Sequence, residues 1–549
     1  MWKQLFWSLC AAWLGCAAPA AEMLLIPTPQ SLEWRAGELR PGAAGVEIGF
    51  EAGEAGHELY SVLRELGVPA AVVNGAGQVR VRPMALPPGA YLLEVAPEGL
   101  TLAGDVHAAA ATLAQLRREG GAFPACRVVD APLYAHRGLL LDEARSPLGA
   151  EEVRRVLRLM ARYKLNRLHW HLTDDQGWRV EIRSYPRLTQ VGGSRAESPR
   201  PESRYEGDGR PLRAFYTQQE IRELVDYAHR LGITIIPEFE IPGHATAILA
   251  AYPELGNTDI PGYRAPTVSC KWGVHRTVLA PKEETLRFIG QVLDELCELF
   301  PHAETIGIGG DEVPRSEWEQ SPAVQQFMRE RGMTRAAEVQ DFFTRRAAAM
   351  LEARGRRALC WDEVLESDSL PDNVQCLVWR GTPAARLAEQ KGVPAILCPR
   401  SHFYFDYPQG HAPRNGQYNG FPAKGVFPWQ KLLRYDPAQY PNAVGVQGNA
   451  WGEAIQSPAK LEYMLLPRLC ALAEVAWAPA ETRPSEADFR RRIEAQYPAW
   501  DAAGLNFREE DGTPRRDRAA AAAQGPAEED NPHAFDMTAG EEEPAGSAR

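Results

Sequence analysis

Length, composition and charge bound the class of protein. The chain has 549 residues, enough for two or more domains, and its 45% hydrophobic and 24% charged content is ordinary for a globular protein with a sizeable core. The net charge is −12 and no basic stripe is present, so the sequence lacks the signature of a nucleic-acid partner.

The first residues have the pattern of a secretory signal peptide. Lys3 precedes the apolar run 5–15, and the small residues 17–21 fit a cleavage site, so residues 1–21 are assigned to it. We therefore expect export to the periplasm, the cell surface or the extracellular space. Cys16 resembles the modified residue of a bacterial lipoprotein signal, which leaves lipid anchoring as an alternative. No segment is long and apolar enough for an integral membrane span.

Residues 22–130 form the first predicted domain. Short apolar runs alternate with turns, and two stretches have helical patterns. The predicted strands are 45–50, 78–81, 91–95 and 100–103, and the predicted helices are 57–66 and 106–118. Because this region contains no chemical motif, we interpret it as a small non-catalytic α/β domain that supports the rest of the chain.

Residues 131–507 show strands that alternate with helices. The predicted strands are 137–141, 167–172, 234–239, 305–308, 358–361, 376–379, 395–398 and 443–447. The predicted helices include 151–163, 218–231, 282–300, 335–353 and 458–474, and Thr217 with Glu220 forms a capping box. This pattern predicts an α/β fold, a (β/α)₈ TIM-type barrel with C-terminal helices, preceded by a small α+β domain. A doubly wound sheet is the alternative, but no glycine-rich phosphate turn follows the first strand.

Two other segments lack a regular pattern. Residues 192–213 are rich in Gly, Pro, Ser and Arg and are predicted to form a long loop. Residues 508–549 are rich in Ala, Glu and Pro. Such a segment cannot bury enough apolar surface to become ordered, so we predict a disordered acidic tail.

The stretch TIGIGGDEVP, residues 305–314, combines a strand with two adjacent carboxylates. A β-branched run leads through Gly309 and Gly310 into Asp311 and Glu312. Glycines there let the backbone leave regular geometry. Two carboxylates at a strand end suggest acid–base chemistry, although a loop with an Asp helix cap is an equally simple interpretation of this stretch alone.

Polar residues follow all eight predicted barrel strands. In a barrel, the carboxyl ends of the strands converge on one site. In chain order these residues are Asp142 and Arg145; His169, His171, Asp174 and Asp175; Glu238, Glu240 and His244; Asp311 and Glu312; Trp361, Asp362 and Glu363; Trp379 and Arg380; His402, Tyr404 and Asp406; Trp451 and Glu453. Such a ring is hard to reconcile with a purely structural role and predicts an active site.

Two chemistries fit this ring. His169 and His171 alternate on one strand and would face the same side, as metal ligation requires, with Asp174, His244 and Asp311 as further ligands. Glycoside hydrolysis is the favoured alternative, because a carboxylic acid can protonate the leaving oxygen while Trp faces and charged side chains hold the sugar. We expect no cofactor and no catalytic metal.

The motifs in their order resemble the family-20 glycoside hydrolases, the β-N-acetylhexosaminidases. They are LDEAR (141–145), LHWHLTDDQGW (168–178), PEFEIPGH (237–244), GGDEVP (309–314), WDE (361–363), VWRG (378–381), YFD (404–406) and NAWGE (449–453). The resemblance covers roughly residues 135–480. It implies exo-acting, retaining hydrolysis of terminal non-reducing β-linked GlcNAc or GalNAc from an oligosaccharide or glycoconjugate. The acetamide of the substrate would be the nucleophile, and an oxazolinium would be the intermediate.

The same resemblance implies roles for individual residues. Glu312 would be the general acid and then the base, and Asp311 would orient the acetamide and stabilise its positive nitrogen. The implied substrate-binding residues are Arg145, Asp174, His244, Trp361, Trp379, Tyr404, Asp406, Trp451 and Glu453. Glu240 departs from the Asp that some members carry, which puts its support of Asp311 in doubt.

The adjacency of Asp311 and Glu312 gives a physical reason for such a mechanism. Consecutive side chains on an extended chain point in divergent directions, so the two are poorly placed to flank one bond as nucleophile and acid. A substrate that carries its own nucleophile removes the need for a second carboxylate at ~5 Å. A sugar-binding protein that kept the pocket and lost catalysis is the alternative, but the intact pair argues against it.

Overall fold

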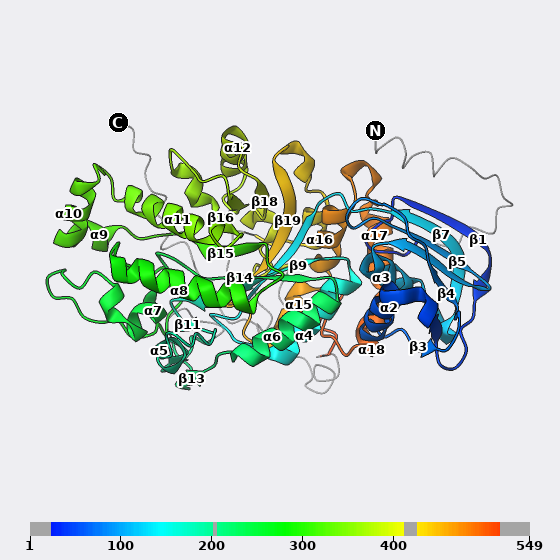
Figure 1. The fold of residues 1–549 in the computed structure, drawn as a ribbon. Helices are drawn as coiled ribbons and strands as arrows, with labels where there is room; N and C mark the ends of the chain where they lie inside the picture. The colour runs from blue at the N-terminus through cyan, green and yellow to red at the C-terminus, as the bar shows by residue number, and fades with distance from the viewer. Residues whose placement is uncertain (1–22, 201–205, 411–424, 517–549) are drawn as a thin grey trace.

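The computed structural model describes residues 23–200, 206–410 and 425–516. Within them the chain forms an N-terminal sheet with two helices and a larger closed barrel surrounded by helices (Figure 1). This confirms the predicted fold class, a (β/α)₈ barrel preceded by a small α+β domain. The predicted signal peptide with Cys16 and residues 517–549 of the predicted tail lie outside the described residues.

The N-terminal sheet has the strand order β1-β7-β5-β6-β4. Its strands are β1 (Ser31–Leu39), β4 (Val79–Val81), β5 (Tyr91–Ala96), β6 (Gly99–Gly104) and β7 (Phe123–Asp130), and β2 (Val46–Gly49) pairs with β3 (Ala70–Val73). Sequence analysis missed β1, β3 and β7. The register of β1 shifts between Trp34 and Glu38, which interrupts the alternation that would reveal a strand.

Eight parallel strands close the barrel in the order β8-β9-β14-β15-β16-β17-β18-β19. They are β8 (His136–Asp142), β9 (Arg167–His171), β14 (Thr234–Glu238), β15 (Thr305–Gly309), β16 (Arg357–Trp361), β17 (Val374–Val378), β18 (Ala395–Leu397) and β19 (Ala443–Ala450). All eight overlap predicted strands, because short apolar runs that alternate with helical patterns are a strong signal. Register pairs Asp142 with His171 and His171 with Glu238, so these strand ends lie at one level.

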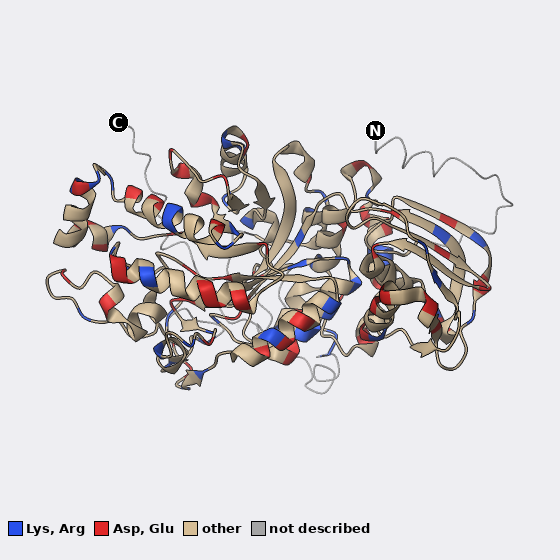
Figure 2. Cartoon of the chain, viewed as in Figure 1, with Lys and Arg blue, Asp and Glu red and all other residues tan. Residues whose placement is uncertain are grey.

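Amphipathic helices surround the barrel. They include α4 (Ala150–Arg162), α6 (Gln218–Arg230), α7 (Thr246–Ala251), α8 (Glu283–Leu299), α9 (Ser316–Gln320), α10 (Pro322–Glu330), α11 (Ala337–Glu352), α12 (Thr382–Lys391), α14 (Trp429–Leu433), α15 (Pro458–Leu465), α16 (Arg468–Trp477), α17 (Glu486–Glu494) and α18 (Tyr497–Ala502). The capping box predicted for α6 is confirmed. Acidic and basic residues are interspersed along α4 and α6, as on a solvated face (Figure 2).

The helix predicted over residues 458–474 is two helices. The chain breaks between α15 and α16 at Leu466 and Pro467. Proline has no backbone N–H to donate within a helix and its ring clashes with the preceding turn, so it interrupts the pattern that the apolar periodicity suggested. The prediction of one continuous helix was therefore wrong at this point.

The described chain ends in an ordered segment. Residues 508–516 were predicted to be disordered, but Arg508 and Pro514 form a bridge, and Arg515 hydrogen-bonds to Asp501 and Glu509. These charge-assisted contacts hold a segment that has little apolar side chain to bury. Across the described ranges, no helix combines the length and apolar character needed to cross a membrane.

A buried ion pair joins the N-terminal sheet to the barrel. Helix α3 (Val106–Leu116) packs against α4, and α2 (Gly53–Glu65) against α6 (Figure 1). Beside them, Lys164 Nζ lies 2.9 Å from Asp130 Oδ2 and 2.9 Å from the hydroxyl of Tyr91. The indole N–H of Trp477 donates to Asp130 Oδ1 at 2.8 Å. The Asp130 carboxylate at the end of β7 thus accepts hydrogen bonds from side chains of both the N-terminal domain and the barrel domain.

We expect Lys164→Met to destabilise the fold by about 3 kcal/mol, because it leaves the buried Asp130 charge without its cation. Urea unfolding would measure the change, and the double variant Lys164→Met/Asp130→Asn should recover part of it. Arg35→Ala is the matched control, since its pair with Glu94 is partly exposed, and it should cost less than ~1 kcal/mol. An equal loss for both single variants would contradict the assignment.

Candidate active site

The carboxyl ends of the barrel strands bring the predicted polar residues together. Asp142 ends β8, His171 ends β9 and Glu238 ends β14. Asp174 lies in the short strand β10 (Thr173–Asp174), directly after β9, and pairs with β11 (Gly177–Trp178). Parallel pairing forces these ends to one rim, so residues distant in sequence become neighbours.

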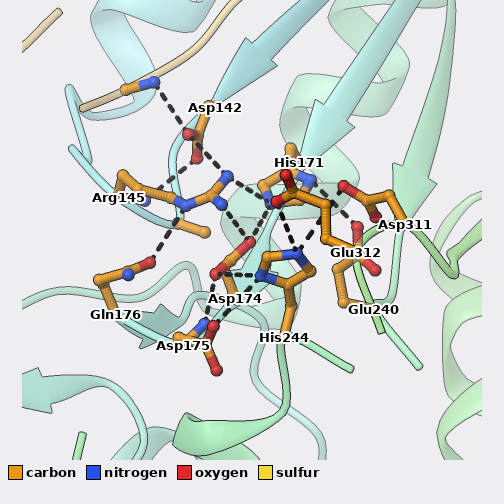
Figure 3. Close-up of polar contacts among 12 residues, drawn as sticks. Asp142, Arg145, His171, Asp174, Asp175, Gln176, Glu240, His244, Asp311 and Glu312 are labelled. Atoms are coloured by element: carbon orange, nitrogen blue, oxygen red, sulfur yellow. Dashed lines mark hydrogen bonds and ion pairs between the residues drawn. The ribbon is translucent and has the colours of Figure 1, made fainter. Parts of the chain in front are cut away.

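Asp174 lies at the centre of a buried network (Figure 3). Its Oδ2 accepts hydrogen bonds from Arg145 Nη2 at 2.7 Å and from His171 Nε2 at 3.0 Å, and its Oδ1 lies 3.2 Å from His244 Nδ1. Burial favours the neutral acid, but the charges of Arg145 and His244 outweigh it and hold the pKa of Asp174 well below its usual range. Asp174 is therefore an ionised buried carboxylate.

His244 links this network to the two adjacent carboxylates. Its Nδ1 lies 3.2 Å from both Asp174 Oδ1 and Asp175 Oδ2, while its Nε2 faces Asp311 Oδ2 at 3.7 Å and Glu312 Oε2 at 3.8 Å (Figure 3). Burial lowers the pKa of His244, but the carboxylates of Asp174 and Asp311 outweigh burial and raise the pKa well above its usual value. The protonated ring can donate toward both sides.

Asp311 and Glu312 occupy different environments. The side chain of Asp311 is 15% exposed, whereas that of Glu312 is 43% exposed. Glu312 has φ 51, so the extended conformation expected at this pair is not adopted, and both carboxylates approach the same nitrogen of His244. Burial, opposed by His244, raises the pKa of Asp311 to about 6. The difference in exposure, rather than divergence along a strand, separates the two groups.

Glu240 packs beneath the turn that carries the pair. A Cβ atom on Gly309, which has φ +64, would lie 1.6 Å from Glu240 Oε2. The same oxygen accepts a hydrogen bond from the Gly310 amide at 3.3 Å. Burial and the neighbouring carboxylates of Asp311 and Glu238 raise the pKa of Glu240 well above its usual range. The longer side chain at position 240 therefore fits only because residue 309 has no side chain.

Arg145 is held by several internal groups. Its Nε donates to Gln176 Oε1 at 3.1 Å and its Nη1 donates to Asp142 Oδ2 at 3.2 Å, in addition to the pair with Asp174. The guanidinium also lies 5.3 Å from the centre of the Trp451 ring. Arg145 is 7% exposed, so the network fixes its orientation and leaves few N–H groups for a ligand.

Aromatic rings line the rim beside this network. The Trp361 and Trp451 rings lie 5.6 Å apart, Tyr404 lies 6.1 Å from Trp451, and Trp379 stacks near Tyr404 at 6.4 Å. The indole N–H groups of Trp361 and Trp451 have no hydrogen-bond partner among the described residues, nor does Asp311 Oδ1. Buried polar atoms without partners are costly, so their concentration beside apolar ring faces favours a ligand site.

Asp406 and Glu453 complete the predicted ring. Burial raises the pKa of Asp406 well above its usual range, and the Glu453 carboxylate adds to the effect. Burial also raises the pKa of Glu453, against the attraction of Arg145. Asp406 Oδ1 has no hydrogen-bond partner among the described residues. Both carboxyl groups thus hold a proton more tightly than a solvated acid does.

The substrate-binding residues implied by the sequence omit two neighbours that the structure adds. Trp379 Nε1 donates to Glu363 Oε2 at 3.1 Å, and burial with the Asp311 charge raises the pKa of Glu363 to about 8. Gln176 accepts a hydrogen bond from Arg145 Nε through its Oε1, and its Nε2 donates to the backbone oxygen of Lys271 at 2.9 Å. Glu363 follows a strand end and Gln176 follows the Asp174-Asp175 pair, so their positions in the motifs were the available signal.

The proposed metal ligands are not brought to one point. Clusters of histidine and carboxylate atoms do occur among the described residues: His171 with Glu238 and Glu240, Asp174 with Asp175 and His244, and His244 with Asp311 and Glu312. His169 belongs to none of them, and its Nδ1 contacts Gln447 Nε2 at 3.1 Å. His169 Nε2 and His171 Nδ1 lie 3.2 Å and 2.5 Å from the same oxygen, Glu238 Oε2, so the two imidazoles face one side of the strand and have a protein carboxylate as their shared partner.

We expect Gly309→Ala to be more damaging than Gly310→Ala. Both residues have positive φ, which costs an alanine ~1–2 kcal/mol, but only the methyl group at 309 collides with Glu240. Urea unfolding should reveal a further loss of ~1–3 kcal/mol for Gly309→Ala. In Gly309→Ala/Glu240→Ala the collision is removed and only the backbone cost should remain; no recovery in this double variant would refute the steric explanation.

Comparisons with known proteins agree with this architecture. The model for the catalytic domain of glycosyl hydrolase family 20 matches residues 134–480, and that for domain 2 of the same family matches residues 22–131. The chain is 35% identical over 480 residues to a beta-hexosaminidase of Vibrio furnissii, covering 83% of this chain and 77% of the relative.

Two further proteins are similar. A beta-hexosaminidase of Porphyromonas gingivalis is 37% identical over 70% of this chain, which spans 48% of that relative's length. The crystal structure of a family-20 exo beta-N-acetylglucosaminidase from Vibrio harveyi, in complex with N-acetylglucosamine, has a TM-score of 0.78 and 30% identity, covering 90% of this chain and 80% of that one. Because the catalytic-domain model matches more than half of the residues, the chain belongs to glycosyl hydrolase family 20.

Proposed function

We propose that the protein is an exo-acting, retaining β-N-acetylhexosaminidase that removes terminal β-linked GlcNAc or GalNAc from glycans. The observation that carries the proposal is the pair Asp311–Glu312 facing His244 at the barrel rim, within a chain of this family. The relatives carry the name beta-hexosaminidase, which supports the substrate class. The substrate is an oligosaccharide or glycoconjugate outside the cytoplasm, consistent with the predicted signal peptide.

Glu312 is the general acid and then the general base in this proposal. Its side chain is the more exposed of the two carboxylates, so it can reach a leaving oxygen at the mouth of the site. In the first step the acetamide carbonyl oxygen attacks the anomeric carbon while Glu312 gives its proton to the departing oxygen. In the second step the Glu312 carboxylate takes a proton from water, which attacks the same carbon and opens the oxazolinium ring.

Asp311 supports the acetamide nucleophile. Ionised Asp311 accepts a hydrogen bond from the acetamide N–H and stabilises the positive charge that develops there. Its unpartnered Oδ1 is available for this contact, while His244 holds Oδ2. Both carboxylates approach one histidine nitrogen, an arrangement unsuited to placing a nucleophile and an acid on opposite sides of a glycosidic bond. The substrate's own nucleophile removes that requirement.

The remaining rim residues bind the sugar. Trp361, Trp379 and Trp451 form the walls of the acetamide pocket and a platform for the sugar face. Tyr404 donates to the acetamide oxygen. The hydroxyl groups are bound by Arg145, Asp406 and Glu453, and Asp174 with His244 positions the catalytic pair.

We expect the purified protein to release the aglycone from an aryl β-N-acetylglucosaminide and not from the matching β-glucoside, because glucose lacks the acetamide. Measuring kcat/KM on both substrates tests the mechanism directly. Comparable turnover of the glucoside would exclude catalysis by the substrate's acetamide, and binding of N-acetylglucosamine without turnover would favour a sugar-binding protein.

We expect Glu312→Gln to lower kcat by ~10²–10⁴-fold on aryl glycosides with poor leaving groups. The loss should be much smaller for an activated phenol that departs without a proton. Glu319→Gln, an acid of the exposed helix α9, is the matched control and should retain activity. A loss independent of the leaving group would argue against the role of general acid.

We expect kcat/KM to fall below about pH 6, because burial raises the pKa of Asp311 to about 6 and protonation removes the negative charge that stabilises the intermediate. Above this pH Asp311 is ionised, so the acidic limb of the profile of kcat/KM against pH should end in a plateau. Steady-state rates against pH would measure it. Asp311→Asn should lower activity and abolish this acidic limb, and an unchanged limb in the variant would assign it to another group.

A further inference from the structure

A pocket of about 440 Å³ that several polar side chains line lies beside the active site. It is formed by the start of helix α7 and by the segment 266–277, which connects α7 to α8. Its lining includes Thr246, Ser269, Lys271, His275, Arg276 and Thr277. This volume is within the range of small-molecule sites and is large enough for a sugar unit or a charged substituent.

Two hydrogen-bond routes join this pocket to the catalytic network. Thr246 donates through Oγ1 to Asp175 Oδ1 at 2.5 Å, and Asp175 contacts His244. On the other side, Gln176 donates through Nε2 to the backbone oxygen of Lys271 at 2.9 Å. Figure 3 shows Asp175 beside His244 and Gln176 beside Arg145, so the two routes enter the network at these two side chains.

The pocket is cationic in an acidic protein. Lys271, His275 and Arg276 line it, whereas no aspartate or glutamate does, although the whole chain has a net charge of −12. No carboxylate of the described residues lies within ion-pair distance of Lys271 or Arg276. Two cations without an acidic partner at one pocket favour an anionic ligand.

The segment that carries these cations is held in place. The Ser269 amide donates to the backbone oxygen of Asp175 at 3.0 Å, and Ser269 Oγ lies 2.9 Å from His275 Nε2. Trp272 is 7% exposed, and the Arg195 guanidinium lies 5.4 Å from the centre of its ring. A preformed site loses less entropy on binding than a loop that must become ordered.

We propose that this pocket is a subsite for an anionic group, a sulfate ester or a carboxylate, on the glycan next to the terminal N-acetylhexosamine. The proposal rests on the hydrolase function proposed above and deepens it, because it assigns a substrate class to a surface outside the network around Asp311 and Glu312. The shared chemistry is an oxyanion that accepts hydrogen bonds from Lys271 and Arg276, with the hydroxyls of Thr246 and Ser269 beside them.

The test uses three matched disaccharides in which terminal β-N-acetylglucosamine is 3-linked to galactose, to galactose 6-sulfate or to galacturonic acid. The ratio of kcat/KM for each anionic substrate to that for the neutral one is measured for the wild type and for Lys271→Ala/Arg276→Ala. We expect the wild type to hydrolyse at least one anionic disaccharide with a higher kcat/KM than the neutral one. In the double variant the ratio of the two kcat/KM values should be about tenfold lower. Comparison of the galactose 6-sulfate substrate with the galacturonic acid substrate identifies whether the pocket binds a sulfate ester or a carboxylate.

Arg264→Ala is the control variant, because Arg264 is an exposed cation of the same loop and does not line the pocket. Its ratio should equal that of the wild type. Equal ratios in the wild type and the double variant, or an equal loss in the Arg264 control, would overturn the proposal.

Failure of the proposed hydrolysis can be separated from failure of this subsite. If the wild type hydrolyses none of the three disaccharides, the hydrolase assignment fails, and saturation-transfer NMR with galactose 6-sulfate and galacturonate alone then tests the pocket. Binding to the wild type that is weakened at least fivefold in the double variant would support an anion site. Equal binding to both proteins, or no binding to either, would refute it.

Discussion

The active centre depends on Asp174, a carboxylate buried among cations. It binds Arg145 at 2.7 Å and His244 at 3.2 Å, so one ionised group orients both the guanidinium and the ring that faces Asp311 and Glu312. Removing a charge from water costs several kcal/mol, which only well-placed partners offset. The orientations of Arg145, His171 and His244 follow from this requirement for compensation.

The parallel barrel supplies the geometry for that compensation. Asp142, His171 and Glu238 end three consecutive strands of the barrel at one level, and the short strand β10 directs Asp174 between Arg145 and His244. The turn after β15 then uses Gly309 so that Glu240 can pack beneath the adjacent acids. Burial raises the pKa values of Asp311, Glu240 and Glu363, whereas the cations lower that of Asp174. One rim therefore holds carboxyl groups with very different proton affinities, as acid–base catalysis requires.

Sequence analysis succeeded where the pattern is local. The eight barrel strands are short, largely apolar runs between turns, and the capping box at Thr217 and Glu220 involves residues three apart. It failed where local patterns are interrupted. Apolar periodicity predicted one continuous helix over residues 458–474, but Pro467 divides it, and the register shift in β1 interrupts the alternation of apolar and polar residues in that strand. It also predicted an extended chain at Asp311–Glu312, whereas Glu312 has φ 51, in a turn that packs on Glu240 from the segment after β14.

The sequence by itself determined the succession of strands and helices, the ring of polar residues at the strand ends, and the resemblance of the ordered motifs to family 20. These features are encoded in residues near one another along the chain. Only the tertiary structure decided which nitrogen of His244 faces the two adjacent acids, that Asp311 is more buried than Glu312, and that Lys271 and Arg276 line a pocket with no acidic residue in its lining. Distances, burial and charge compensation depend on side chains brought together by barrel closure, and these quantities set proton affinity and ligand charge.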